Sequence, residues 1–410
     1  MCKSDSNGGA AIVSRRLTEA LRQNGVDATL LVADKTSDED FAVKASYPLR
    51  KPLAFLMERM EIFTHNGFSR KNLFKTDTAS FGLPLWNHPI VKGADAVILN
   101  WVNQGMLSLK GVRRICAMGK RVVWTMHDMW NLTGICHHAM DCRNFEKKCG
   151  NCFYLGKKSS PEDLSYRIHH RKEALYDDCD IKFVAVSRWL AKEAAKSSLL
   201  KDRKIEPIHN PFETIEDSIL TTEDRNGFRV MFSAASIDNW IKGLSTLRKA
   251  AGIIASTEPE LAGSIELVFM GGLRNTEVLS DFPLQYTYLG KLSGEKEIAD
   301  AFHNSDVTVN CSHFENLPTT LIEGQAYGSI PVAFDRGGQA DIIDHLSTGF
   351  LASWDDDEEK RAANLAQGII WALRQTARGC DDIKARMREN VERKFSYSSV
   401  AKRYIELLQA

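Results

Sequence analysis

The chain has 410 residues, of which 43% are hydrophobic and 26% are charged, and its 53 Lys and Arg residues balance 53 Asp and Glu residues. A chain of this length usually exceeds a single hydrophobic core, so we expect a globular protein of two domains. The balanced charge excludes a general nucleic-acid binder, because binding of that kind depends on many cationic side chains that neutralise phosphates.

Short β-rich runs alternate with amphipathic helical segments along the chain. Near-continuous apolar strands separated by helices are typical of parallel sheets covered on both faces, so the sequence predicts an α/β fold. A segment rich in Pro and acidic residues, 205–228, interrupts this alternation and predicts a linker, with a domain boundary near residue 209. The predicted strands are 27–32, 96–101, 121–126, 182–187, 228–234, 265–271, 307–312 and 330–335, and the predicted helices include 10–24, 163–178, 188–197, 243–255 and 319–327.

A glycine-rich turn, Gly8 and Gly9, lies close to the beginning of the chain. A loop of this kind that faces a phosphate normally follows a strand, yet only a few residues precede it here. We therefore expect the first strand to be very short or absent, and in the latter case the natural start to lie upstream. Two adjacent glycines also suit a plain turn that binds nothing.

Residues 49–75 combine apolar side chains with several Arg and Lys residues. A basic amphipathic segment can lie on an anionic membrane surface, and this gives one interpretation. The other is that the segment packs over the sheet of the first domain and lines an acceptor cleft. The sequence leaves both open.

His127 and Asp128 follow directly after the predicted strand 121–126. Ligands of open α/β sheets bind at the carboxyl ends of the strands, so His127 is placed to hydrogen-bond a substrate. A single histidine at such a position is also compatible with a structural role.

Four of the nine cysteines, Cys136, Cys142, Cys149 and Cys152, fall within one short segment. The sequence shows no apolar run of about 20 residues for a membrane span and no apolar leader after Met1, so we expect a cytosolic protein with reduced thiols. The Cys-Gly-Asn-Cys spacing at the end of the cluster suits a tetrahedral structural zinc site. Free thiols and a redox pair are the alternatives.

Two carboxylates and a lysine stand out in the second half of the chain. Glu315 precedes the predicted helix at 319–327, and Glu323 lies inside it, with seven residues between them. The start of a helix favours an anion, and carboxylates there accept hydrogen bonds from the hydroxyls of a sugar or ribose. Lys242 lies between a strand and a helix, where an ammonium group can neutralise a diphosphate leaving group. A capping Glu and a solvated Lys are the plain alternatives.

The segment 314–332, with its Glu pair, small residues, Ile-Pro-Val run and following Gly337-Gly338, resembles the signature of the family-4 retaining glycosyltransferases of the GT-B fold. The resemblance extends over about 6–408 and includes Lys242-Gly243, the opening loop at 6–32, His127 and the Ser-Arg segment at 187–190. It implies two Rossmann-like parallel-sheet domains that face each other across a cleft, and no catalytic metal. Within the family, the chain is similar to bacterial polysaccharide enzymes of the colanic-acid type.

The resemblance also implies roles for individual residues. Lys242, Glu315 and His127 would be catalytic, with Glu315 near the donor sugar. Donor binding would involve the ribose contact of Glu323, the backbone amides of Asn316 and Leu317 at the diphosphate, and Gly8 with Gly9. Many members carry an Arg five residues before the lysine, whereas this chain has Ile237.

We therefore expect an N-terminal acceptor-side domain of residues 1–208 plus 396–410, which includes the Cys-rich loop 136–152, and a C-terminal donor-nucleotide domain of residues 209–395. The expected activity is transfer of a hexose from a nucleoside diphosphate sugar to a saccharide or lipid-linked acceptor, with retention, in polysaccharide or glycolipid synthesis. The location would be cytoplasmic, with peripheral contact to the inner membrane face through 49–75. A non-catalytic zinc-stapled binding member is one alternative. The other is a dinucleotide-dependent oxidoreductase, which lacks its expected Gly-x-Gly-x-x-Gly fingerprint here.

Overall fold

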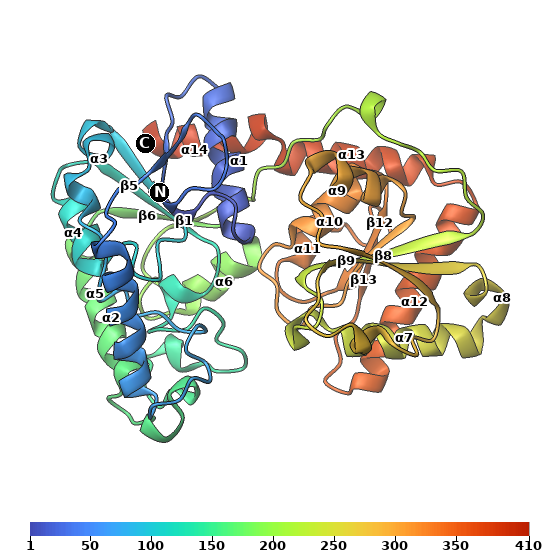
Figure 1. Ribbon diagram of the computed structural model, residues 1–410, viewed down its shortest axis with the longest axis horizontal. Coiled ribbons are helices and arrows are strands. Elements are labelled where there is room, and N and C mark those ends of the chain that lie inside the picture. The colour runs from blue at the N-terminus through green and yellow to red at the C-terminus, as the bar shows by residue number, and fades with distance from the viewer. Residues whose placement is uncertain (410) are drawn as a thin grey trace. The chain divides into compact units, whose positions relative to one another are not determined.

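The computed structural model describes residues 1–409, which divide into two compact units (Figure 1). Unit 1 comprises Met1–Pro211 together with the residues from Val400 on, and unit 2 comprises Phe212–Ser399. Both are built on parallel strand pairs, so the predicted α/β class with two parallel sheets is confirmed.

The strands of unit 1 form two parallel ladders, in the orders β1-β2-β3 and β4-β5-β6-β7. Backbone hydrogen bonds from Lys3 N to Trp101 O (2.8 Å) and from Asn100 N to Met1 O (2.9 Å) join them edge to edge. The combined order β3-β2-β1-β4-β5-β6-β7 reverses direction between β1 and β4, which is the point where doubly wound sheets bind ligands. The strands are β1 (Cys2–Ser4), β2 (Leu30–Asp34), β3 (Ala42–Lys44), β4 (Ala96–Leu99), β5 (Arg121–Met126), β6 (Ile181–Ala185) and β7 (Ile205–Pro207).

Helices α4, α5 and α6 of unit 1 begin at capping residues that the sequence supplies. Ser108 and Ser187 each accept a hydrogen bond from a backbone N–H of the helix that they precede, and Asp163 accepts two. The last helix packs on this unit, because Tyr404 Oη lies 2.9 Å from Thr125 Oγ1 and Lys182 Nζ donates to Leu407 O at 2.9 Å. The helices are α1 (Gly9–Gln23), α2 (Arg50–His65), α3 (Pro89–Gly93), α4 (Leu109–Cys116), α5 (Leu164–Asp178), α6 (Arg188–Lys196) and α14 (Tyr397–Gln409).

Unit 2 has one parallel sheet in the order β10-β9-β8-β11-β12-β13, so its order reverses between β8 and β11. Helices α7 and α12 pack together, as do α10 and α13, and Figure 1 shows the two pairs on opposite sides of the sheet. The strands are β8 (Phe228–Ser236), β9 (Ile265–Gly272), β10 (Gln285–Gly290), β11 (Val307–Asn310), β12 (Ile330–Phe334) and β13 (Phe350–Ala352). The helices are α7 (Leu244–Thr257), α8 (Pro259–Ala262), α9 (Glu295–His303), α10 (Thr319–Ala326), α11 (Gln339–Ile342), α12 (Glu358–Ala377) and α13 (Asp381–Phe395).

The core of unit 2 contains the apolar residues that the strand pattern predicts. Phe232, Phe269 and Val309 of three neighbouring strands are buried, and Leu247 and Leu365 cover them from α7 and α12. Because helices cover both faces, the central strands are apolar on both sides.

Two expectations about local structure need adjustment. A strand does precede Gly8, but it has only three residues, Cys2–Ser4, which agrees with the expectation of a very short first strand. The predicted linker 205–228 was too long at its start, because residues Ile205–Pro207 form β7 and pair with β6. A short edge strand that contains a proline gives little pattern to recognise.

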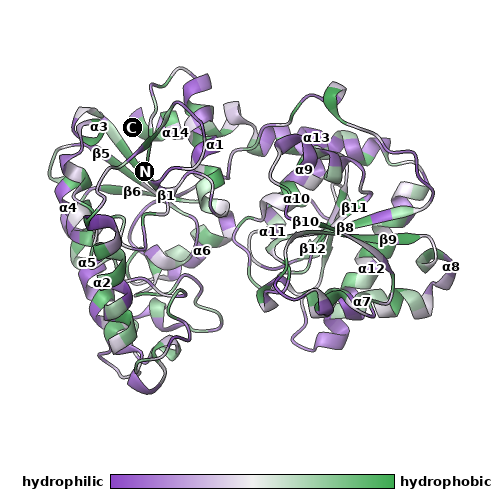
Figure 2. Ribbon diagram, in the orientation of Figure 1, coloured by the Kyte–Doolittle hydropathy of each residue, from purple (hydrophilic) through white to green (hydrophobic). Residues whose placement is uncertain are grey.

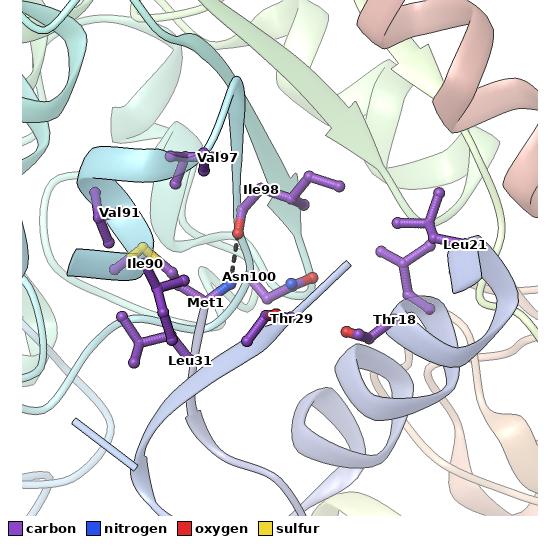
Figure 3. Close-up of a pocket in the computed structure, with 12 residues that line it drawn as sticks. Met1, Thr18, Leu21, Thr29, Leu31, Ile90, Val91, Val97, Ile98 and Asn100 are labelled. Carbon is purple, nitrogen blue, oxygen red and sulfur yellow. Dashed lines mark hydrogen bonds between the residues drawn. The ribbon is translucent and has the colours of Figure 1, made fainter. Parts of the chain in front are cut away.

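Figure 3 shows a small cavity of about 90 Å³ in unit 1, lined by residues of α1, β2 and β4. The Met1 ammonium group donates a 2.6 Å hydrogen bond to Ile98 O at its wall, while Leu17 and Leu31 make it largely apolar. None of the predicted site residues lines this cavity. Within residues 1–409, no helix has both the length and the apolar character needed to cross a membrane.

Candidate functional site

Lys242 and Glu315 meet at the carboxyl edge of the unit 2 sheet. Lys242 follows β8 and Glu315 follows β11, the two strands between which the sheet order reverses. Their side chains form an ion pair, and both are partly exposed, 26% for Lys242 and 16% for Glu315. The structure therefore brings these two predicted residues together at the place where open α/β sheets bind ligands.

The two loops that carry this pair pack tightly against each other. Gly243 adopts a left-handed conformation (φ 74°), and a Cβ atom there would lie 2.1 Å from the carbonyl oxygen of Cys311. His313 N donates to Ile241 O at 2.7 Å, and the Cys311 thiol lies 3.2 Å from Gly243 O. The glycine after Lys242 is thus required by the close approach of the two loops.

Glu315 is held by the residues around it. Ser312 Oγ donates to Glu315 Oε1 at 3.0 Å, and Gly338 N donates to Glu315 O at 3.1 Å. The turn at Gly337 allows this contact, because its φ is 70° and a Cβ atom there would lie 2.2 Å from Glu315 O. The contact between Ser312 and Glu315 was not predicted from the sequence. The one sequence signal for Ser312 was its position at the end of a strand.

Three of the donor-binding candidates lie on the segment that continues from Glu315. Asn316 and Leu317 are buried in the loop that leads into α10, and Glu323 is half-buried within that helix. No side chain caps the first turn of α10 at Pro318, so its backbone N–H groups favour an anion. Ile237, where many family members have Arg, is fully buried in the unit 2 core and donates its N–H to Gly272 O.

In unit 1, Gly8 lies in the loop between β1 and α1, and Gly9 is the first residue of α1. Gly8 has a φ of 94°, and a Cβ atom added at either glycine would meet no atom within 4 Å. The preceding loop is fixed by buried Asp5, whose carboxylate accepts hydrogen bonds from Thr36 N (3.0 Å) and Ser37 N (3.1 Å). The glycine turn is therefore anchored yet open on its outer side.

His127 follows β5 and contacts the residue that follows β4. Its Nε2 lies 3.0 Å from Asn100 Oδ1, so Nε2 carries the proton that is donated to Asn100. Burial lowers the pKa of His127 to about 4, although Asp128 opposes the shift. The side chain is thus a neutral imidazole near pH 7. His127 and the Gly8–Gly9 turn lie along the same carboxyl edge of the sheet.

A buried ionic network lies next to His127 and was not predicted from the sequence. His137 lies 2.7 Å from Asp128 through Nδ1 and 2.7 Å from Asp77 through Nε2, and Asp77 also pairs with buried Arg59. Burial alone would lower the pKa of His137, but Asp128 and Asp77 raise it to about 10. The imidazolium ties the irregular segment after β5 to the segment that precedes η1 (Leu85–Asn87).

The four clustered cysteines lie within that irregular segment. Gly134 N donates to the Cys149 thiol at 3.2 Å, and burial, with repulsion from Cys149, raises the pKa of Cys136 to about 12. Burial and repulsion from Cys136 do the same for Cys152. Across residues 1–409, however, no three His, Cys, Asp or Glu side chains form a group that could hold a metal ion. Structural zinc at Cys136, Cys142, Cys149 and Cys152 therefore stays a prediction.

The segment 49–75 forms α2 and the loop after it, and several of its apolar side chains are exposed. Leu53 and Leu56 are 57% and 56% exposed, whereas Ala54, Glu58 and Ile62 make up the buried side of α2. Figure 2 shows hydrophobic residues along the length of α2. We call this surface the α2 apolar face; it consists of Leu49, Leu53, Leu56, Met57, Met60, Phe68 and Phe74.

Comparisons with known proteins agree with this geometry. The family model described as "Glycosyltransferase Family 4" matches residues 7–215, and that described as "Glycosyl transferases group 1" matches residues 220–394. The chain is 24% identical over 232 residues to the putative colanic acid biosynthesis glycosyl transferase WcaC of Escherichia coli K12. That match covers 52% of this chain and 54% of WcaC, about half of each protein.

Solved structures show the same fold over the whole chain. A glycosyltransferase from Rickettsia africae aligns with a TM-score of 0.61 at 15% identity, covering 99% of this chain and 96% of its own. Anabaena HepE, solved in complex with UDP-glucose, aligns with a TM-score of 0.58 at 14% identity, covering 99% and 98%. The fold is thus that of the GT-B glycosyltransferases.

Proposed function

The chain belongs to Glycosyltransferase Family 4, and we propose that it is a retaining enzyme that moves a hexose from a nucleoside diphosphate sugar to an acceptor hydroxyl. The observation that carries the proposal is the Lys242–Glu315 ion pair at the point where the unit 2 sheet reverses its order. The oxidoreductase alternative has no support, because both matching family models describe glycosyltransferases.

In this proposal unit 2 binds the donor. The diphosphate lies against the uncapped start of α10 and the amides of Asn316 and Leu317, while Glu323 accepts hydrogen bonds from the ribose. A diphosphate competes with Glu315 for the Lys242 ammonium group. Once Lys242 has released it, the Glu315 carboxylate can accept a hydrogen bond from a hydroxyl of the donor sugar. Because HepE was solved in complex with UDP-glucose, UDP is the first nucleotide to test.

The reaction follows from these contacts. The bond between the sugar anomeric carbon and the diphosphate oxygen breaks, and the acceptor oxygen bonds to that carbon on the same face. The acceptor proton passes to the departing diphosphate oxygen, so no protein nucleophile takes part. Lys242 stabilises the negative charge that develops on the leaving group, and the tight packing at Gly243 holds the backbone that carries it.

Unit 1 takes the acceptor in this proposal, while its Gly8–Gly9 turn and His127 remain candidates for contacts with the donor. The open turn at Gly8 and Gly9 and the neutral His127 lie at one edge of its sheet. A neutral imidazole can exchange hydrogen bonds with sugar hydroxyls without adding charge, which suits His127 to orient sugar rather than to carry a proton at neutral pH.

We propose that the acceptor is a saccharide, either free or linked to a lipid. The enzyme would then act in the synthesis of a polysaccharide or glycolipid. The partial similarity to WcaC and the exposed α2 apolar face both support this proposal. Exposed Arg50, Arg70, Lys71 and Lys75 lie in the same segment, whose acidic residues Glu58 and Glu61 are not exposed. A basic, apolar surface of this kind suits the headgroup region of an anionic membrane, so unit 1 would bind there peripherally.

Sedimentation with vesicles tests the membrane contact. We expect the wild-type protein to bind vesicles that contain anionic lipid better than vesicles of phosphatidylcholine alone. The variant Leu53→Gln/Leu56→Gln/Met60→Gln should lose most of this binding, while Met118→Gln, a partly exposed methionine of the same unit, should keep it. Equal sedimentation of all three proteins would remove the membrane contact from the proposal.

A panel of nucleotide sugars tests the activity itself. The purified protein is incubated with UDP-, GDP- and TDP-sugars, with and without saccharide acceptors, and release of the nucleoside diphosphate is measured. We expect turnover with one donor class, and a product that keeps the anomeric configuration of the donor. Binding of a nucleotide without any turnover would favour the non-catalytic alternative.

A further inference from the structure

A pocket of about 580 Å³ lies in unit 1 at the carboxyl ends of β1, β2 and β3. Its polar lining comes from the ends of those strands, from the start of α2 and from the loop after β4. Loop and helix pack closely, because a Cβ atom at Gly105 would lie 2.6 Å from Phe55 N. The residues that define its chemistry are Lys3, Asp34, Lys44, Lys51, Phe55 and Gln104.

This pocket holds more positive than negative charge. Three lysines, Lys3, Lys44 and Lys51, line it, and Asp34 is the single carboxylate in the lining. Asp34 is shared, because it forms an ion pair with Lys51 and lies 3.6 Å from Lys3 Nζ. Lys44 is exposed at the end of β3.

Lys3 is held in place before any ligand arrives. Its side chain is 13% exposed, its Nζ donates to Gln104 O at 3.3 Å, and it lies 5.9 Å from the centre of the Phe55 ring. Burial lowers the pKa of Lys3; Asp34 opposes that shift and the neighbouring Lys51 cation adds to it. An anion in the pocket would offset both the burial and the repulsion between the two ammonium groups.

We infer that this pocket binds a phosphate group carried by the acceptor. The inference rests on the proposed function, since it adds the chemical class of the acceptor to the acceptor side of unit 1. A pocket lined by three lysines and one carboxylate favours a compact, strongly charged anion over a neutral sugar. The phosphate can belong to a lipid headgroup or to a soluble sugar phosphate. A lipid is geometrically suitable because Lys51 and Phe55 lie on α2, the helix that carries the α2 apolar face.

Calorimetric titration with inorganic phosphate tests the pocket. We expect saturable binding to the wild-type protein and at least about tenfold weaker binding to Lys44→Gln/Lys51→Gln, since each charge-assisted contact contributes more than a factor of ten. Lys110→Gln, an exposed lysine of the same unit outside the pocket, should bind phosphate like the wild type. No phosphate binding by the wild type, or an equal affinity of the double variant at an unchanged Tm, would overturn the inference.

A titration with UDP separates this inference from the proposed function. We expect Lys44→Gln/Lys51→Gln to bind UDP like the wild type, because neither lysine is a donor-binding candidate and the proposed ribose and diphosphate contacts, Glu323, Asn316 and Leu317, lie in unit 2. If UDP binds and phosphate does not, the pocket inference fails while the proposed function stands. If the wild type binds neither UDP nor any sugar nucleotide, the proposed function fails first.

Vesicles distinguish the two sources of phosphate. Phosphatidic acid added to phosphatidylcholine vesicles should increase sedimentation of the wild type more than that of Lys44→Gln/Lys51→Gln if the headgroup enters the pocket. If the phosphate comes from a soluble acceptor, the double variant should lose calorimetric phosphate binding but sediment with these vesicles like the wild type. Both results support a phosphate pocket and differ only in what carries the phosphate.

Discussion

Two charged groups of this protein, the Lys242–Glu315 pair in unit 2 and the Asp77–His137–Arg59 network in unit 1, differ in their exposure. In unit 2, Lys242 and Glu315 form one partly exposed ion pair, which a ligand can reach and rearrange. In unit 1, the side chains of Asp77, His137 and Arg59 are almost entirely buried, and Asp77 forms ion pairs with both His137 and Arg59. The comparison separates charges that are available for binding and catalysis from charges that fix a loop.

Breaking the buried network should have the largest effect. His137→Ala leaves Asp77 and Asp128 without their shared partner, and loss of one member of a buried ionic group typically costs about 3–5 kcal/mol. We expect the unfolding free energy of unit 1 to fall by that amount in urea denaturation. His170→Ala, which removes a half-exposed contact to Glu173, should change it by less than about 1 kcal/mol. A similar loss of unfolding free energy in the two variants would contradict the distinction between buried and exposed charges.

Removing the exposed pair should affect catalysis instead of folding. We expect Lys242→Ala to lower turnover by about 10²–10³, as for other groups that stabilise a developing negative charge, with little change in Tm. The matched control is Lys249→Ala, which breaks exposed ion pairs of α7 with Glu358 and Glu359. If the two variants keep equal turnover, Lys242 is not part of the catalytic site.

The pH dependence of stability tests whether the charge of His137 stabilises the buried network. The pKa of His137 is raised to about 10 in the folded protein and is about 6.5 in an unfolded chain. The contribution of protonated His137 to the unfolding free energy is therefore complete below about pH 6.5 and is lost as the pH rises through about 10. The difference in unfolding free energy between wild type and His137→Gln should shrink between about pH 6 and about pH 10. A constant difference over that range would show that His137 is not protonated in the folded protein.

Much of the sheet framework was predictable because it depends on local pattern. The apolar run predicted at 121–126 is β5 with the same bounds, and the helix predicted at 319–327 is α10 within one residue. Edge strands were harder, because β10 (Gln285–Gly290) is mostly exposed and carries no continuous apolar pattern.

The candidate site was predictable where it follows strand ends and a family signature. Lys242 and Glu315 are far apart in sequence, yet both follow strands that become neighbours at one edge. The Asp77–His137 contact was not predictable, because it joins two irregular segments that no periodicity relates. For residues 49–75 the sequence left a membrane contact and packing over the sheet open, and it did not show which face of α2 is buried; the structure buries Glu58 and Ile62.

The central claim is that the carboxyl edge of the unit 2 sheet binds the nucleotide of the donor. Calorimetric titration with UDP, comparing wild type, Glu323→Ala and Glu260→Ala, tests it most directly. Glu260 is an exposed residue of α8 on the same unit and serves as the matched control. We predict that Glu323→Ala weakens UDP binding by roughly tenfold to a hundredfold, the range for a lost charge-assisted hydrogen bond, while Glu260→Ala leaves it unchanged. Equal affinity of Glu323→Ala and wild type for UDP would contradict the account.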